Sequence, residues 1–291
     1  MKLSNRQFGF LLSAPGALVL FLWIIIPLIL LVVASFLRYD NLHPIQFWGF
    51  KNYLKILQDR VFWLSFKNTL VFCTGVTLFT FVISMILAQS LSRISKGSSL
   101  LRSLTMFPWA VPMVVSGFIW AQMFNPSFGV INDFLLRTGI ISKSLNIYGN
   151  PNLAMIGVII ADSWTRIPFM TIIILAGLES IDPSLYEAAR VDGADSLQTF
   201  RYVSLPLNVK AMLTGIIITM IFSFRTIDTI FSMTFGGPAK STYTFGFYIL
   251  DYIYRYFDFG VAGAMSIIMV FLMLIIGGIF ILQFIRAEGR D

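Results

Sequence analysis

The chain has 291 residues, of which 57% are hydrophobic and only 12% are charged. Ordinary soluble domains carry about 25% charged residues, so this composition excludes a cytosolic enzyme, a disordered chain and a secreted disulfide scaffold. The net charge of +7 comes from basic residues that do not cluster, which argues against a nucleic-acid partner. The sequence therefore indicates an all-α, polytopic membrane protein surrounded by membrane lipid.

Six apolar stretches are long enough for a transmembrane helix, which needs about 20 residues. They occupy residues 10–37, 69–91, 104–124, 153–178, 209–231 and 261–285. Lys2 and Arg6 precede the first stretch, which makes a cleaved signal peptide the alternative there. Its apolar part is longer than a signal core, so we expect an uncleaved span, kinked at Pro15 and Pro27.

An even number of spans places both termini on one side of the membrane. The basic residues divide almost equally between the two sets of connecting segments, but the segments on the side of the termini are shorter. The higher density of positive charge there favours cytoplasmic termini.

Three connecting segments differ in character. Residues 38–68 alternate aromatic and charged side chains, which predicts a helix lying along the membrane surface, and residues 125–152 are rich in turn-forming residues, which predicts an irregular loop. In residues 179–208, Asp182 and Pro183 predict a helix start, Gly193 predicts its end, and a second helical stretch follows over about 194–203. This helix–turn–helix is suited to docking on another protein, and a plain interfacial loop is the alternative.

Charged residues at membrane depth mark the fourth span. Asp162 and Arg166 lie four positions apart, with Thr165 and Phe169 on the same helix face. A charge at the middle of a bilayer costs at least about 2.5 kcal/mol on insertion scales, so such residues usually face a cavity or a partner. We expect a substrate cavity here. In the alternative, the two charges neutralise each other and hold helices together.

The fifth span carries a polar and aromatic stripe at helical spacing. Its members are Thr219, Phe222, Ser223 and Thr226. Such a stripe either lines a cavity or joins packed helices. Arg225 and Asp228, three positions apart near the end of this span, are expected to form a structural or gating ion pair.

No pattern in the chain predicts a catalytic, metal or cofactor site. Residues 236–242 are only superficially similar to a phosphate-binding loop, because Ala239 stands where the motif requires glycine. Cys73 lies in an apolar run and is expected to be a buried hydrophobic residue, and His43 has no neighbouring metal-ligand pattern. The chain is therefore expected to bind no ATP of its own.

One motif carries a resemblance to a known family. The run Glu187-Ala188-Ala189-Arg190-Val191-Asp192-Gly193-Ala194, followed by Leu205-Pro206, resembles the EAA motif of ABC importer permeases. Further segments, among them Thr234-Phe235-Gly236-Gly237-Pro238, resemble the maltose-type carbohydrate permeases, and more closely the MalF-like half of the permease pair. This resemblance implies a type I ABC importer permease fold and a single permease domain over residues 1–291.

The resemblance also implies roles for residues. It makes 179–208 a cytoplasmic loop that couples to an ATPase, with the coupling residues Glu187, Ala188, Ala189, Asp192, Gly193, Leu205 and Pro206. It implies a sugar pathway lined by Asp162, Thr165, Arg166, Phe169, Thr219, Phe222, Ser223 and Thr226. The charged residues depart from the neutral, amide-lined site of the maltose type.

The implied partners complete the expectation. They are a second, MalG-like permease, two cytoplasmic ATPase subunits that hold ATP and Mg, an extracytoplasmic sugar-binding protein and the sugar itself, at a bacterial or archaeal inner membrane. The alternative function is an ion-coupled secondary carrier that uses Asp162 and Arg166 as a relay. A carrier needs no ATPase-docking loop, so the EAA-like run favours the permease.

Overall fold

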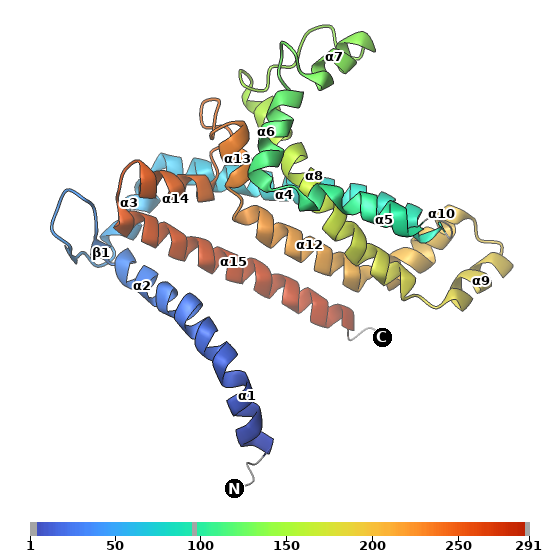
Figure 1. Ribbon diagram of the computed structural model, residues 1–291, viewed down its shortest axis with the longest axis horizontal. Helices are drawn as coiled ribbons and strands as arrows, with labels where there is room; N and C mark the ends of the chain where they lie inside the picture. Colours follow the sequence, from blue (N-terminus) through green and yellow to red (C-terminus); the bar gives the residue numbers. More distant parts are fainter. Residues whose placement is uncertain (1–4, 95–97, 289–291) are drawn as a thin grey trace. The chain divides into compact units, whose positions relative to one another are not determined.

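The computed structural model describes residues 5–94 and 98–288, and these form helices joined by short connections, with one two-stranded hairpin (Figure 1). In chain order the elements are α1 (Asn5–Leu20), η1 (Phe21–Ile25), α2 (Ile26–Ser35), β1 (Leu37–Arg38), β2 (Gln46–Phe47), α3 (Lys51–Gln58), α4 (Arg60–Ser92), α5 (Ser98–Met106), η2 (Phe107–Ala110), α6 (Met113–Met123), α7 (Val130–Arg137), α8 (Pro151–Glu179), α9 (Pro183–Val191), α10 (Ser196–Thr199), η3 (Phe200–Ser204), α11 (Leu205–Leu207), α12 (Val209–Phe224), α13 (Asp228–Met233), α14 (Phe245–Tyr254) and α15 (Phe259–Glu288). The chain forms two compact units, residues 1–62 with 249–272, and residues 63–248 with 273–291.

Within the described residues, four helices are long and apolar enough to cross a membrane, and two bent pairs raise the number to six. The predicted third span is wrong as a single helix, because Ser99–Ala110 and Met113–Met123 meet at 93°. Pro108 and Pro112 explain the bend, since proline removes a backbone donor and restricts the residue before it. The second bent pair, Ser196–Leu207 with Val209–Phe224, meets at 68°.

The fifth span also ends earlier than predicted. Helix α12 stops at Phe224, and the short helix α13 starts only at Asp228, so the predicted helix over 209–231 is interrupted. The other spans agree with the prediction to within a few residues, except that α4 begins at Arg60 rather than at residue 69.

The first unit joins the first span to a short helix, α3, through a hairpin. Helices α1 and α2 are continuous through a π-helical turn at Phe21–Ile25, where Pro27 supplies no N–H to the carbonyl four residues before it. Strands β1 and β2 pair antiparallel, with Leu37 opposite Phe47. The buried amide of Asn52 on α3 donates to the carbonyls of Ser35 and Leu37, both at 2.8 Å. The predicted helix within residues 38–68 is therefore confirmed as α3.

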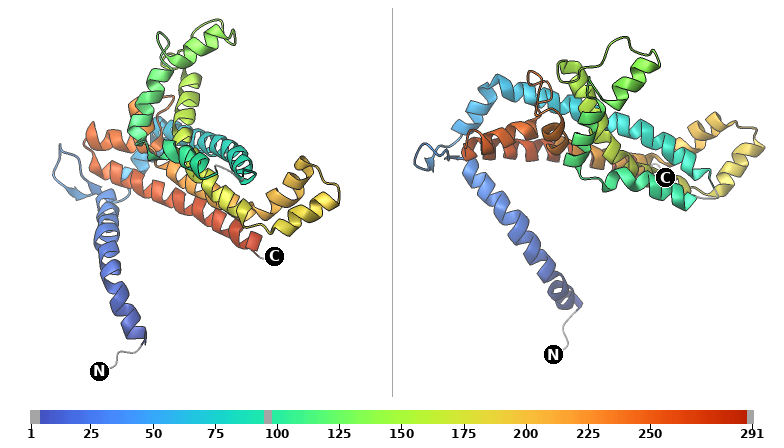
Figure 2. Two further views of the ribbon diagram at one scale, coloured as in Figure 1. Left: turned by 45° about the vertical axis from the view of Figure 1, so that its right-hand side comes forward. Right: turned by 45° about the horizontal axis from the view of Figure 1, so that its top comes forward.

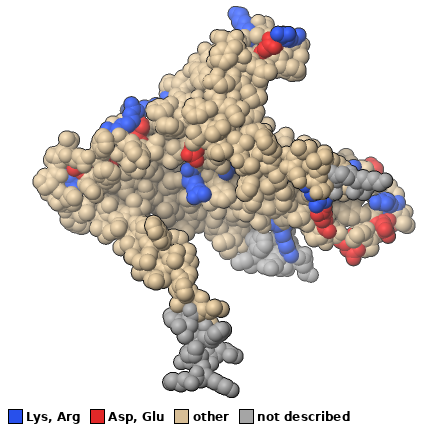
Figure 3. Space-filling model, viewed as in Figure 1, with Lys and Arg blue, Asp and Glu red and all other residues tan. Residues whose placement is uncertain are grey.

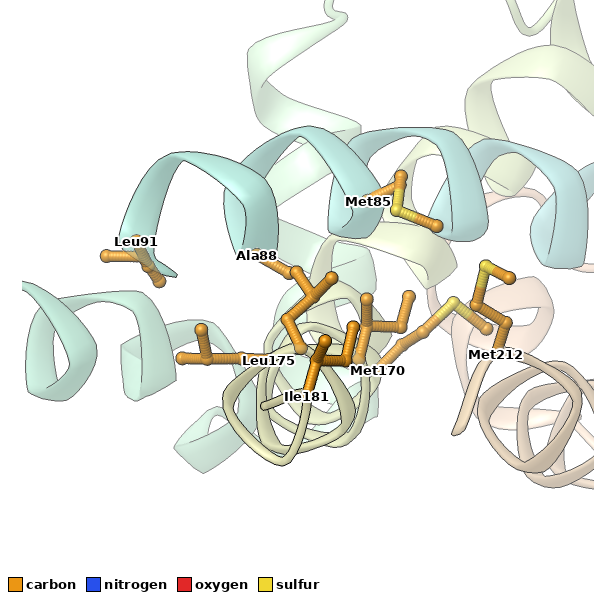
Figure 4. Packing of buried hydrophobic residues seen from close by; sticks show 9 residues of the cluster. Met85, Ala88, Leu91, Met170, Leu175, Ile181 and Met212 are labelled. Carbon is orange, nitrogen blue, oxygen red and sulfur yellow. The ribbon is translucent and has the colours of Figure 1, made fainter. Parts of the chain in front are cut away.

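In the second unit, α8 and α12 run side by side in all three views (Figures 1 and 2). The C-terminal half of α8 and the N-terminal half of α12 pack with the C-terminal part of α4 around one apolar cluster (Figure 4). The buried members of this cluster, called the inner cluster below, are Met85, Ala88, Leu91, Met170, Ile174, Leu175, Leu178, Ile181 and Met212. Tight packing of this kind holds membrane helices together without help from the hydrophobic effect.

The segment 125–152 is not wholly irregular. It contains helix α7, which a pair of charges four positions apart stabilises: the Arg137 guanidinium donates to the Asp133 carboxylate at 2.8 Å, and this hydrogen bond raises the pKa of Arg137. The prediction missed this helix because turn-forming residues flank it on both sides.

Candidate functional site

A central cavity of about 500 Å³ lies in the second unit, against the middle of α8. Its lining residues come from η2, α6, α8, α12, the connection that follows α12, and the start of α13: Trp109, Met113, Thr165, Arg166, Phe169, Thr219, Phe222, Arg225, Thr226 and Asp228. Helices α8 and α12 supply the two long walls, and the bend between η2 and α6 brings in the third. Sequence segments more than one hundred residues apart therefore meet at one place.

A buried ion pair lies on α8, next to the central cavity. The Arg166 guanidinium donates to both oxygens of the Asp162 carboxylate, at 2.5 and 3.2 Å. Arg166 also donates to the Thr226 hydroxyl at 2.6 Å, and the Thr229 hydroxyl donates to Asp162 at 3.1 Å. Both charges are thus paired and hydrogen-bonded at membrane depth, where an unpaired charge would be costly.

This network spans the break in the fifth transmembrane segment. Thr226 lies in the connection between α12 and α13, and Thr229 lies in α13. Two side chains of α8 therefore hold the connection and the helix that follows it. The geometry combines the two alternatives for Asp162 and Arg166, a substrate cavity and a neutralising pair. The two charges pair with each other, and Arg166 also lines the cavity.

Six of the eight predicted pathway residues line the central cavity: Thr165, Arg166, Phe169, Thr219, Phe222 and Thr226. The other two do not. Asp162 is 0% exposed and lies behind Arg166, whereas Ser223 is 1% exposed and its hydroxyl donates to the Thr219 carbonyl at 2.8 Å. Asp162 is placed to position Arg166 rather than to touch a ligand.

Arg225 and Asp228 do not form the ion pair that their spacing predicts. Within the described residues, no oxygen of Asp228 lies within 4.0 Å of the Arg225 guanidinium, whose central carbon instead stands 5.1 Å from the centre of the Phe222 ring. The helix ends between the two residues, so they no longer share one helix face. Both line the cavity, where each charged group is open to a ligand.

The aromatic side of the cavity includes residues that the sequence patterns missed. Trp109 stands nearly parallel to Phe169, with ring centres 6.4 Å apart and an angle of 14° between the planes. Trp109 and Met113 reach the cavity only because the chain turns sharply between Pro108 and Pro112. The two prolines beside a tryptophan were the sequence signal that could have predicted this turn.

Most of the molecular face in Figure 3 is uncharged, with a small group of charged side chains near its middle.

The segment between α8 and α12, residues 179–208, folds as a helix–turn–helix and is called the EAA loop below. The Asp182 carboxylate caps α9 by accepting from the Ser184 backbone N–H at 2.9 Å, and this bond lowers the pKa of Asp182. Gly193 has a φ of 77°, which closes the end of α9 in the left-handed conformation. Asp195 and Gln198 form a capping box for the next helix. The predicted start and end of α9 are confirmed.

Helix α9 presents two different faces. Tyr186, Glu187 and Arg190 line a second cavity of about 710 Å³ between the EAA loop and the ends of α4 and α8, called the loop cavity below. The opposite face is exposed and carries Leu185 at 44% exposure and Ala188. Tyr186 does not share the exposed face of Leu185 and Ala188, because it turns inward and its hydroxyl lies 3.3 Å from that of Ser204.

The remaining predicted coupling residues have distinct positions. Ala189 is half-buried, Asp192 follows the last residue of α9, and Pro206 is exposed in α11. Leu205 packs against the inner cluster, together with Tyr186 and Phe200. The EAA loop is therefore fixed to the same core that holds α8 and α12, which are the walls of the central cavity.

The central cavity carries the kinds of groups from which small-molecule binding sites are built. Hydroxyl groups, two guanidinium groups and one carboxylate can form hydrogen bonds, and three aromatic rings offer apolar faces. Among the residues that the structure describes, no group of three or more His, Cys, Asp or Glu side chains is placed to hold a metal ion.

Comparison with known proteins gives a consistent set of relatives. Residues 80–287 match the family described as binding-protein-dependent transport system inner membrane component. The trehalose/maltose transport system permease protein MalF of Thermococcus litoralis is 34% identical over 276 residues, which are 94% of this chain and 92% of that protein. The sulfoquinovosyl glycerol transport system permease protein SmoG of Agrobacterium fabrum is 32% identical over 294 residues, with 99% and 93% covered.

A solved structure shares the fold. It is a chain of a bacterial alginate ABC transporter in complex with an alginate pentasaccharide-bound periplasmic protein, with a TM-score of 0.80, 22% identity, and 95% of this chain and 93% of that chain covered. The predicted all-α ABC importer permease fold is thereby confirmed.

Proposed function

This chain belongs to the family of binding-protein-dependent transport system inner membrane components, and we propose that it forms one half of the membrane pathway of an ATP-driven sugar importer. The observation that carries the proposal is the shared core of its two sites: the EAA loop and the walls of the central cavity pack on one inner cluster. A movement imposed on the loop from outside would therefore reach the cavity walls.

The central cavity supports a saccharide as the substrate. Thr165, Thr219 and Arg225 offer hydrogen bonds to sugar hydroxyls, and Phe169 and Trp109 offer aromatic faces to the apolar side of a pyranose ring. The names of the relatives refer to trehalose, maltose and sulfoquinovosyl glycerol, all of which are sugars or sugar derivatives.

The exposed face of α9 supports docking on a cytoplasmic ATPase. Leu185 and Ala188 form a small apolar surface that nothing in the chain covers within the described residues, next to Val191, which is 87% exposed. Gly193 and Asp192 follow at the end of the helix, where an incoming surface has close access to the backbone. ATP and Mg would be held entirely by that ATPase.

The proposed assembly contains two copies of the ATPase, a second MalG-like permease and an extracytoplasmic sugar-binding protein. One EAA loop serves one ATPase, so two ATPase copies require a second permease. The proposed orientation has both termini in the cytoplasm, which places the EAA loop on the side of the ATPase.

The test is uptake by the purified complex in proteoliposomes. The binding protein and labelled trehalose or maltose are placed outside, and ATP and Mg are placed inside. We expect uptake that requires both the binding protein and internal ATP. Uptake driven by an ion gradient in the absence of ATP would instead establish the secondary carrier and refute the proposal.

A paired variant addresses the EAA loop. Glu187→Lys places a third cation beside Arg93 and Arg190 in the loop cavity and is expected to displace α9, whose outer face meets the ATPase. It should therefore abolish ATP-dependent uptake and the stimulation of ATPase activity by loaded binding protein, while the subunit still enters the membrane. The matched control is Lys143→Glu, a charge reversal in the segment before α8, which is expected to leave coupling intact. Wild-type uptake by Glu187→Lys would remove the coupling role from this loop.

A further inference from the structure

The loop cavity adjoins a smaller apolar groove, and two residues of α4 line both spaces. Gln89 and Arg93 line both the loop cavity and this groove, whose volume is about 290 Å³. The groove continues along α4 past Met85 and Ile86, and Phe200 of the EAA loop closes its other side. A polar space and an apolar space thus meet at one pair of side chains.

Opposite charges line the polar side. Arg93 and Arg190 supply two cations and Glu187 supplies an anion, and within the described chain none of these three takes part in an ion pair. The fourth charged group, Glu179, is already paired with Arg102. The loop cavity therefore offers separate sites for a negative and a positive group.

A buried acceptor in the same place also lacks a partner. The side-chain oxygen of Gln89 is buried and accepts no hydrogen bond within the described residues. Leaving a buried polar atom unpaired is costly, so such an atom usually meets a donor that belongs to a ligand or to water. The Gln89 oxygen thus marks a place for an N–H or O–H donor between the two spaces.

The apolar groove has the position expected for an acyl chain. Ile86 is 58% exposed and lies about 10 Å before Arg93 along the axis of α4, from a rise of about 1.5 Å per residue. Ile86 thus lies at hydrocarbon depth when Arg93 lies at the depth of lipid headgroups.

We propose that this site binds a phospholipid whose headgroup carries a primary ammonium, as phosphoethanolamine does. Arg93 and Arg190 bind the phosphate, Glu187 and the Gln89 oxygen accept from the ammonium, and an acyl chain lies in the groove along Ile86 and Phe200. The lipid thereby supports α9 from its membrane side and leaves the outer face of α9 to the ATPase. This inference rests on the proposed function, because it requires the EAA loop on the cytoplasmic side.

The experiment uses the complete complex with its partner permease and ATPase subunits. It is reconstituted into nanodiscs that contain equal amounts of phosphatidylethanolamine and phosphatidylcholine, and native mass spectrometry then counts the lipids that the permease retains. The two headgroups share the phosphate, but the trimethylated amine of choline has no N–H to donate. We expect preferential retention of the ethanolamine lipid.

Two variants and one control assign the site. Arg93→Gln is expected to lower retention of the ethanolamine lipid about tenfold, because a charge-assisted bond contributes more than about 1.4 kcal/mol, a factor of ten. Gln89→Leu removes only the acceptor and is expected to lower the preference for ethanolamine over choline. The matched control Arg201→Gln, on the same loop but outside both cavities, is expected to leave retention unchanged.

Equal retention of the two lipids by the wild-type complex would overturn the proposal. Equal retention of the ethanolamine lipid in Arg93→Gln and Arg201→Gln would also overturn it. So would chemical labelling of arginine in which the ATPase, and not the lipid, protects Arg93. Gln89→Leu keeps the test decisive if Arg93→Gln fails to assemble. In every one of these outcomes ATP-dependent uptake by the wild-type complex still decides the proposed function separately.

Discussion

The central cavity and the EAA loop hold their functional side chains in place in different ways. Around the cavity, Arg166 and Asp162 are bonded to Thr226 and Thr229, which lie 60 and 67 residues further along the chain. In the EAA loop, the capping bonds of Asp182 and Asp195 reach only two or three residues. One site is built by long-range pairing, and the other by local capping.

This difference decides what a single substitution costs. Removing one partner of a buried pair leaves a charge without compensation in the membrane, whereas removing a surface cap changes only one helical turn. The cavity should therefore respond to some substitutions by failing to assemble, and the EAA loop by failing to couple.

The largest effect is expected for Asp162→Asn. It leaves Arg166 buried with its positive charge unpaired, a loss that typically costs about 3–5 kcal/mol of folding free energy. We expect little assembled complex, measured by size-exclusion chromatography of the detergent-solubilised protein and by its thermal unfolding. The control Asp228→Asn removes an exposed carboxylate of the same cavity and is expected to assemble normally.

A double variant sharpens this prediction. Asp162→Asn combined with Arg166→Gln removes both charges and is expected to recover assembly without recovering uptake. If Asp162→Asn alone assembles as well as Asp228→Asn, the ion pair is not what holds the broken span.

Gly193→Val is compared with Gly139→Val, because both glycines have nearly the same backbone conformation and only Gly193 lies in the EAA loop. Gly193 and Gly139 have φ values of 77° and 72°, and an added side chain would meet nothing within 4 Å at either. Both substitutions cost about 1–2 kcal/mol of backbone strain. Only Gly193→Val is expected to reduce the stimulation of ATPase activity by loaded binding protein; an equal loss in Gly139→Val would show that general destabilisation is responsible.

Phe169→Ala affects the cavity without touching its ion pair. An aromatic contact contributes about 0.5–1.5 kcal/mol beyond its buried area, so the KM for sugar uptake is expected to rise about two- to tenfold with assembly unchanged. Uptake kinetics and the yield of complex are measured together. A loss of yield in proportion to the loss of uptake would make Phe169 a packing residue.

The smallest effect is expected when the pH is lowered and the capping carboxylate of Asp182, at the start of α9, becomes protonated. The Ser184 N–H lowers the pKa of Asp182 in the folded protein. The ionised carboxylate therefore contributes its full stability at pH values above the pKa of about 3.9 that Asp has in the unfolded chain. This contribution is lost as the pH falls through the lowered pKa of the folded protein. Hydrogen exchange of the peptide that contains Ser184 should differ between wild type and Asp182→Asn at pH 7 and converge at strongly acid pH. A constant difference at all pH values would contradict this assignment.

The same contrast explains how much the sequence could predict. The ends of α9 follow from Asp182, Pro183 and Gly193, because capping depends on neighbours in the chain. The cavity was predicted only in part, because the placement of Trp109 depends on the 93° bend, and the position of Asp162 behind Arg166 depends on Thr229. Periodicity assigns a residue to a helix face, but it does not show where that helix stops.

The interruption of the fifth span at Phe224 has a consequence for the life of the protein in the cell. The backbone groups at a helix end need hydrogen-bond partners that hydrocarbon cannot provide. The side of the chain that holds Arg225 and Asp228 must therefore face water or another protein, and a subunit without the proposed second permease would expose it to acyl chains. We expect subunits that lack this proposed partner to be degraded by membrane proteases, so that the amount of this chain follows the synthesis of the second permease.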